Sequence, residues 1–177
     1  MKSVGEMSQG ELAAYIDTHL REHGIQVVLS GGACVAIYSE NKYISKDLDF
    51  IARFALDHKR VEAAMQEIGF HRQDRYYHHP GTSFYVEFMS GPPSVGEDPI
   101  GEILELDMST GMLRIISPTD AVKDRLAAFY HWGDRQSLEQ ALLVALSKSI
   151  DLQRVKEWSD REGKGAEFEE FRRRLQS

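Results

Sequence analysis

The N-terminal part of the chain carries apolar residues at helical spacing. They are Leu12, Ile16 and Leu20. Because these positions lie about one turn apart, and because Ser8 and Glu11 have the spacing of a capping box, we expect a helix over residues 9–23. The next apolar run, 25–29, is short and rich in β-branched residues, which favours a strand. A second, shorter helix is expected over 33–39.

Short and alternating apolar segments dominate the middle of the chain. In segment 47–53 apolar and acidic side chains alternate, which predicts a strand. Segment 57–68 has one apolar side and predicts a helix. Glycine and proline clusters separate the remaining segments. Five further strands are expected, over 70–73, 75–78, 83–89, 102–108 and 113–116.

The pattern becomes helical from Ser117 to the end of the chain. Ser117, Pro118 and Asp120 combine a capping residue, a proline at the first helical position and an acid in the first turn. Leucine and alanine spacing then predicts helices over 136–148, 152–161 and 168–175. We therefore expect an α/β (α+β) fold, with a mixed β-sheet flanked by helices and a helical C-terminal third. The expected division is an α/β core over 1–116 and a helical region over 117–177 packed on it.

Composition places the chain among ordinary soluble proteins. Its 177 residues are 42% hydrophobic and 28% charged, and no apolar run approaches the roughly 18 residues that a membrane helix needs. The N-terminus lacks the order of a signal peptide, and the single cysteine, Cys34, excludes an intramolecular disulfide. We expect a cytoplasmic protein. A net charge of −7 disfavours nonspecific nucleic-acid binding, but it accommodates carboxylates that hold divalent cations.

Asp47 and Asp49 are the first candidates for chemistry. Residues i and i+2 of a strand point to the same face, with Cα atoms roughly 6–7 Å apart. Two adjacent carboxylates repel each other, and a bound cation such as Mg²⁺ relieves that repulsion. An isolated Asp-x-Asp is also compatible with a solvated strand end.

Ser30, Gly31 and Gly32 lie between an expected strand and an expected helix. Glycines let the backbone turn sharply and approach a ligand closely, and a helix N-terminus offers N–H groups to phosphate. A simple strand-to-helix turn is the alternative interpretation. Together with the acidic strand, however, the segment pairs an anion cradle with a cation site, as a nucleoside triphosphate with Mg²⁺ requires.

The segment Val27–Gly32, followed by Asp47-Leu48-Asp49-Phe50, resembles the signature of the DNA polymerase β-like nucleotidyltransferase superfamily. In that signature a glycine pair precedes an Asp-hydrophobic-Asp motif. The sequence of these segments is most similar to that of small prokaryotic members, namely minimal nucleotidyltransferases and abortive-infection-type toxins. The interval from Gly32 to Asp47 is slightly longer than in the commonest pattern of the family. The resemblance implies that Asp47 and Asp49 bind the Mg²⁺ or Mn²⁺ ions that bridge the triphosphate.

The resemblance also implies a third carboxylate on a later strand. Glu87 is our choice because apolar neighbours flank it in strand alternation, and Glu105 and Asp107 are its competitors. A glutamate at this place departs from the family's aspartate. Glu87 would act as a metal ligand or as the general base toward the acceptor hydroxyl.

A looser resemblance to the toxin-type members covers the first expected C-terminal helix. It implies that Lys123 contacts the triphosphate as a point charge, and that Arg125 or Arg135 does so in bidentate fashion. Ordinary salt bridges on helix surfaces are the alternative. The expected nucleotide-binding residues are then Ser30, Gly31, Gly32 and Lys123.

The leading hypothesis is a metal-dependent nucleotidyltransferase that moves a nucleoside monophosphate from a nucleoside triphosphate to an acceptor and releases pyrophosphate. The acceptor, whether a protein, a transfer RNA or a small molecule, is left open. One alternative is a catalytically silent binding or antitoxin-type regulatory protein of the same fold, and another is a toxin that modifies transfer RNA. Either a homodimer or a toxin–antitoxin partner would fit.

Two further groups of side chains are interpreted as structural. The histidines of the first group are regarded as surface or turn residues rather than zinc ligands. The aromatic residues of the second group are regarded as core or cross-strand residues rather than as a surface on which a nucleotide base stacks. The members are His71, His78, His79, Tyr76, Tyr77, Phe84 and Tyr85.

Overall fold

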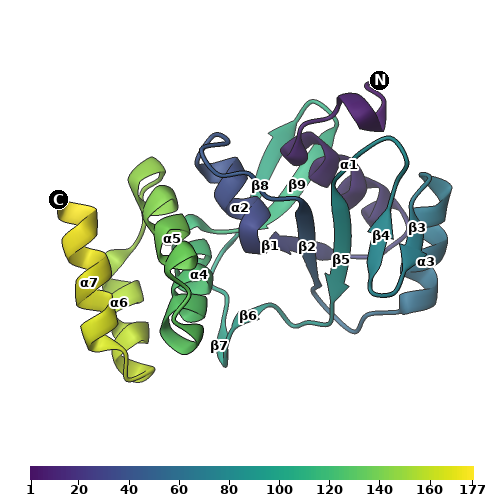
Figure 1. The fold of residues 1–177 in the computed structure, drawn as a ribbon. Coiled ribbons are helices and arrows are strands. Elements are labelled where there is room, and N and C mark those ends of the chain that lie inside the picture. Colours follow the sequence, from purple (N-terminus) through teal and green to yellow (C-terminus); the bar gives the residue numbers. More distant parts are fainter.

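The computed structural model describes the whole chain, Met1–Ser177, and combines one large mixed sheet with flanking helices (Figure 1). The helices are η1 (Val4–Glu6), α1 (Gln9–Glu22), α2 (Gly31–Tyr38), α3 (His58–Glu67), α4 (Pro118–Trp132), α5 (Arg135–Ser147), α6 (Leu152–Arg161) and α7 (Gly165–Gln176). The strands are β1 (Val27–Ser30), β2 (Asp47–Ala52), β3 (His71–Gln73), β4 (Tyr76–His78), β5 (Tyr85–Met89), β6 (Ser94–Val95), β7 (Asp98–Pro99), β8 (Ile103–Met108) and β9 (Gly111–Ile116). The predicted fold class is confirmed.

The seven-stranded sheet has the order β3-β4-β5-β2-β1-β9-β8. Its central strand, β2, pairs antiparallel with β1 and parallel with β5. Strand β1 pairs parallel with β9, so the sheet is mixed. The short strands β6 and β7 form a separate hairpin that the sequence pattern does not predict.

The two faces of the sheet differ because burial alternates along β2. Leu48, Phe50 and Ala52 are buried, whereas Asp47 and Asp49 are only partly buried. Helices α1 and α3 pack together against the apolar face. The capping box predicted for α1 is present, since Ser8 and Glu11 each bond the other's backbone. One face of the sheet therefore forms the core, and the other carries the acidic side chains.

The C-terminal helices cover the part of the molecule beyond α2. Helix α4 begins at the capping residue Ser117, as the sequence predicts, and α4 and α5 both contact α2 (Figure 1). Helices α6 and α7 lie further from the sheet, and α6 is joined to α4 by a buried contact. There Tyr130 stacks on Trp158 and its hydroxyl lies 2.7 Å from Ser159 Oγ. None of these helices, nor any other in the structure, has the length and apolar character needed to cross a membrane.

Candidate active site

The pairing of β2 with β5 gathers three carboxylates on one face of the sheet. Asp47 and Asp49 share this face, and the Cα partner of Asp49 across the pair is Glu87. Neighbouring strands lie about 4.8 Å apart, so the Asp49 and Glu87 side chains stand next to each other. The structure thus places Glu87 where the sequence analysis expected the third acid.

The competing acids lie elsewhere. Glu105 and Asp107 belong to β8 at the edge of the sheet, and β1 and β9 separate that strand from β2. Both residues are exposed, and Glu105 pairs with Arg114 at 3.3 Å. Neither belongs to the group formed by Asp47, Asp49 and Glu87.

Asp49 is the electrostatic centre of this carboxylate group. Burial raises the pKa of its carboxyl to about 7, and repulsion from Asp47 and Glu87 acts in the same direction. Its Oδ1 atom is buried without a hydrogen-bond partner. A cation coordinated by these oxygens would remove both penalties, and an all-carboxylate donor set suits Mg²⁺ or Mn²⁺.

Gly31, the first residue of the glycine pair, packs directly against the Asp49 carboxylate. Gly31 has φ +69°, and a Cβ atom at this position would lie 2.5 Å from Asp49 Oδ2. Only glycine tolerates both the left-handed backbone and the close approach. Ser30 supports the turn from the other side, because its Oγ donates to the Asp49 carbonyl at 3.1 Å.

Helix α2 starts directly beside Asp49. Its N-cap residue, Ser30, makes no side-chain capping bond, and an uncapped helix N-terminus is a suitable place for phosphate. The second glycine, Gly32, is also closely packed, since an added Cβ would lie 3.2 Å from Ser45 Oγ. The Ser45 hydroxyl lies 3.2 Å from Asp47 Oδ1 and can donate to it, so the glycine turn and the acidic strand form one unit.

An aromatic patch borders the carboxylates on the β4–β5 side. The Tyr76 and Tyr85 rings meet edge to face with centroids 5.0 Å apart. Arg75 lies over the Tyr76 ring at 4.9 Å, and its Nε is 3.5 Å from Glu87 Oε1. Tyr76 and Tyr85 are only partly buried, and they pair across β4 and β5, so they are cross-strand residues, one of the two placements that the sequence analysis expected. Tyr77, in contrast, is buried in the core.

Lys123 forms ion pairs, as in the alternative interpretation of this residue. Its side chain is buried, and its Nζ lies 2.5 Å from Asp98 Oδ2 and 3.9 Å from Asp120 Oδ1. The ammonium also lies 5.4 Å from the centre of the Trp158 ring. Lys123 therefore extends from α4 toward Asp98 of β7 and Trp158 of α6, and its charge already has carboxylate partners.

Arg125 lies two residues further along the same helix, about 200° around its axis, on the side of α4 that faces the carboxylates. Its positive charge opposes the rise in the pKa of Asp49. It is held by Asp124 Oδ2 at 2.5 Å and by Gln140 Oε1 at 3.3 Å. Arg135 is not part of this arrangement, since it pairs with Glu170 of α7. Of the predicted basic residues, only Arg125 is near Asp49.

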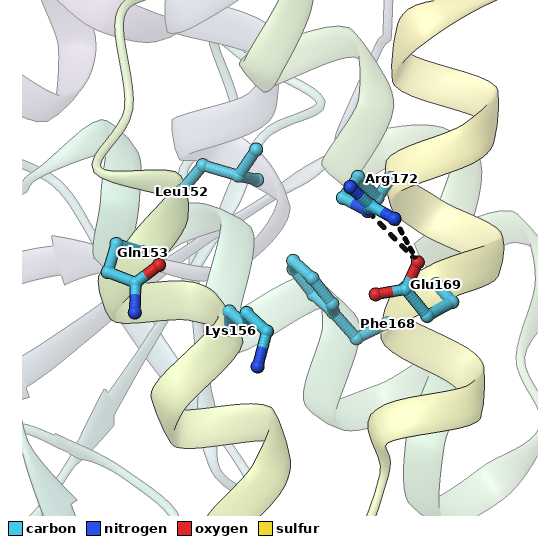
Figure 2. Close-up of a pocket in the computed structure, with 6 residues that line it drawn as sticks. All are labelled: Leu152, Gln153, Lys156, Phe168, Glu169 and Arg172. Carbon is cyan, nitrogen blue, oxygen red and sulfur yellow. Dashed lines mark hydrogen bonds and ion pairs between the residues drawn. The ribbon is translucent and has the colours of Figure 1, made fainter.

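A groove of about 290 Å³ lies between α6 and α7, away from the carboxylates (Figure 2). It is lined by Leu152, Gln153, Lys156, Phe168, Glu169 and Arg172. Its charged groups are already paired, Arg172 with Glu169 and Lys156 with Asp160. The groove therefore offers no free charge to recognise a substrate.

Comparison with known proteins identifies the fold. No protein-family model and no curated protein matches the chain. Among solved structures, it is similar to an antigenic nucleotidyltransferase-like protein from Paracoccidioides brasiliensis, with a TM-score of 0.58 and 13% identity over 77% of this chain and 74% of that one. It is also similar to the antibiotic-resistance factor ANT(2'')-Ia in solution, with a TM-score of 0.55 and 14% identity over 92% and 91% of the two chains. The crystal structure of ANT(2'')-Ia with adenylyl-2''-tobramycin gives 0.55 and 14% over 88% and 94%. The chain therefore has a nucleotidyltransferase-type fold.

Proposed function

We propose that this protein is a metal-dependent nucleotidyltransferase that moves a nucleoside monophosphate from a nucleoside triphosphate to an acceptor hydroxyl. The observation that carries the proposal is the meeting of Asp47, Asp49 and Glu87 on adjacent strands, directly beside the glycine turn at Gly31. This arrangement joins a cation site to a phosphate site. The similar folds of a nucleotidyltransferase-like protein and of ANT(2'')-Ia support it.

Different residues would bind the metal ion and the phosphate groups. Asp47 and Asp49 would hold Mg²⁺ or Mn²⁺, which would neutralise the charge of the triphosphate and polarise the transferred phosphoryl group. The start of α2 at Gly31 and Gly32 would take phosphate oxygens through backbone N–H groups. Arg125 would keep Asp49 ionised by opposing the repulsion from the neighbouring acids.

Glu87 would receive the proton of the acceptor hydroxyl. As the hydroxyl oxygen forms its bond to the α-phosphorus, the bond from that phosphorus to the bridging oxygen breaks and pyrophosphate leaves. The proton passes to the Glu87 carboxylate, which Arg75 holds in place at 3.5 Å. Most of the rate enhancement would come from positioning and charge neutralisation rather than from covalent chemistry.

A small hydroxylated molecule is the acceptor that we favour. The rings of Tyr76 and Tyr85 lie beside Glu87 and offer a surface on which the ring of such a molecule can stack. The acidic site would also attract a positively charged acceptor. A transfer RNA fits less well because the chain has a net charge of −7.

The first experiment is a calorimetric titration of each nucleoside triphosphate with Mg²⁺. It is performed on the native protein, on Asp49→Asn and on Asp107→Asn, the last being a matched control because Asp107 is exposed on the far edge strand. We expect binding that needs Mg²⁺, is lost in Asp49→Asn and persists in Asp107→Asn. Binding that survives in Asp49→Asn, or no binding by the native protein, would contradict the site.

Pyrophosphate release then separates an enzyme from a silent binding protein. The native protein is incubated with the bound nucleotide and with panels of aminoglycosides, other polyols, proteins and transfer RNA. Release that depends on one panel and falls at least about 100-fold in Glu87→Gln supports the transferase. Nucleotide binding without release across all panels would favour the regulatory alternative.

A further inference from the structure

A second cluster of metal-ligating side chains lies where α1 and α3 end. His19 lies in the last turn of α1, His23 is the C-cap residue of that helix, and Glu67 is the last residue of α3. Glu67 Oε2 lies 2.9 Å from His23 Nε2 and 3.5 Å from His19 Nε2. One ligand atom from each residue falls within 4.8 Å of the others.

The hydrogen bonds around these rings favour coordination through His23 Nε2. His23 Nδ1 lies 2.9 Å from the His19 carbonyl oxygen. A proton on Nδ1 that is donated to this carbonyl leaves the lone pair of Nε2 directed toward Glu67. Metal-bound histidines usually have such a carbonyl or carboxylate behind them. His19 Nε2 lies 2.8 Å from the Ala64 carbonyl oxygen and would exchange that contact for the metal.

The backbone around the cluster also favours a cation. Both helices direct their C-terminal ends toward it, and the last carbonyls of a helix carry partial negative charge. The carbonyl oxygens of His19 and Ala64 already lie against the rings. Glu22 adds a further negative charge near His23.

We propose that His19, His23 and Glu67 form a Zn²⁺ site. Two imidazoles and one carboxylate, with a remaining position open to water, are a recurrent ligand set for this ion. Ligands at about 2.0–2.1 Å from a tetrahedral ion stand about 3.3 Å apart, so small side-chain rotations bring these atoms into place. The side chains of His23 and Glu67 are 36% and 55% exposed, which leaves the ion an entry path.

This site is separate from the proposed active site. Helices α1 and α3 pack on the apolar face of the sheet, whereas Asp47, Asp49 and Glu87 lie on the opposite face. The two sites also differ in chemistry, since imidazole nitrogen selects zinc and carboxylate oxygen selects Mg²⁺. A metal here would fasten the end of α1 to the end of α3.

Calorimetric titration of the metal-free protein with Zn²⁺ tests the site. We expect one equivalent to bind the native protein, and we expect Glu67→Gln and His23→Gln each to weaken the affinity by at least about tenfold. His131→Gln is the matched control, because His131 pairs with Glu162 at 3.3 Å without a second histidine. It should bind as the native protein does, and so should Asp49→Asn.

The histidine ring signals in NMR provide a readout that does not depend on affinity. Those of His19 and His23 should move on addition of one equivalent of Zn²⁺, while those of His131 stay in place. Affinity unchanged in Glu67→Gln would mean chelation by two surface histidines only, and would overturn the proposal. Affinity lost in Asp49→Asn but kept in His23→Gln would place the zinc at the carboxylates instead and would equally overturn it.

Discussion

Replacing Asp49 with asparagine keeps the shape of the side chain and removes its charge. Burial, together with Asp47 and Glu87, raises the pKa of this carboxyl from 3.8 to about 7. At about 1.36 kcal/mol per pH unit, this difference amounts to roughly 4 kcal/mol of destabilisation when the group is ionised. Because water and counterions relax around a real charge, we expect asparagine to recover about 2–4 kcal/mol in the absence of divalent ions.

The pH dependence identifies the charge as the cause. The unfolded chain releases this proton near pH 3.8 and the folded protein only near pH 7. The folded state is therefore disfavoured progressively as the pH rises between these values, and fully so above about 7. The gain from asparagine should be largest at pH 8 and should shrink to about 1 kcal/mol at pH 4.5.

Urea unfolding followed by the fluorescence of the buried Trp158 measures this effect. Asp107→Asn, on an exposed strand edge, should change stability by less than about 0.5 kcal/mol at either pH. Adding Mg²⁺ should stabilise the native protein and leave Asp49→Asn unchanged. A gain of the same size at pH 4.5 and pH 8 would show that packing, not charge, is responsible, and our account of the carboxylate group would be wrong.

Three further substitutions, one of them with a matched control, test other parts of the structure. In the same urea assay, Gly31→Ala should lower the free energy of unfolding by about 2–4 kcal/mol, because the added Cβ would meet Asp49. Gly133→Ala is the control: its φ is +65°, but an added Cβ would have no heavy atom within 4 Å, so the loss should be only about 1–2 kcal/mol. Lys123→Met removes an ion-pair partner of Asp98 and should lower the free energy of unfolding by about 2–4 kcal/mol, while the affinity for the Mg²⁺–nucleotide complex, measured by calorimetry, stays unchanged. A large loss of affinity without a loss of stability would instead support the predicted contact between Lys123 and phosphate. Arg125→Gln removes the charge that opposes the raised pKa of Asp49, so half-maximal nucleotide affinity should move to higher pH in a pH series of titrations.

Local signals in the sequence predicted several elements of the fold well. The capping box at Ser8 and the Ser-Pro start at Ser117 act within one helical turn, and both helices begin where expected. The alternation at Asp47 and Asp49 depends only on the period of a strand, and it held in β2. Such features can be read from a sequence because their causes lie within a few residues.

The remaining site features depend on pairing between distant segments. The resemblance implied a third acid, and the apolar neighbours of Glu87 favoured it over Glu105 and Asp107, but the order of the strands in the sheet decides which acid meets Asp49. Lys123 and Arg125 lie on nearly opposite sides of one helix, about 200° apart, and the way that helix packs decides which side faces the carboxylates. Nothing local distinguishes the two.

The proposed zinc site likewise combines a local pattern with a contact between distant segments. The i, i+4 pair of His19 and His23 could have been read from the first expected helix, but its carboxylate comes from the end of another helix. No pattern in the sequence connects Glu67 to α1. The hairpin of β6 and β7 was missed because each strand has only two residues, too few for a periodic signal.

The parallel pairing of β1 with β9 has a consequence for the order in which this protein can fold. Strand β1 obtains one neighbour early, from β2, but its other neighbour begins only at Gly111. On the ribosome, the apolar edge of Val27–Ser30 therefore stays open until most of the sheet has been synthesised. A chain truncated after Met108 should consequently aggregate on expression. Helices α4 to α7, in contrast, are added to a sheet whose strands have all been synthesised.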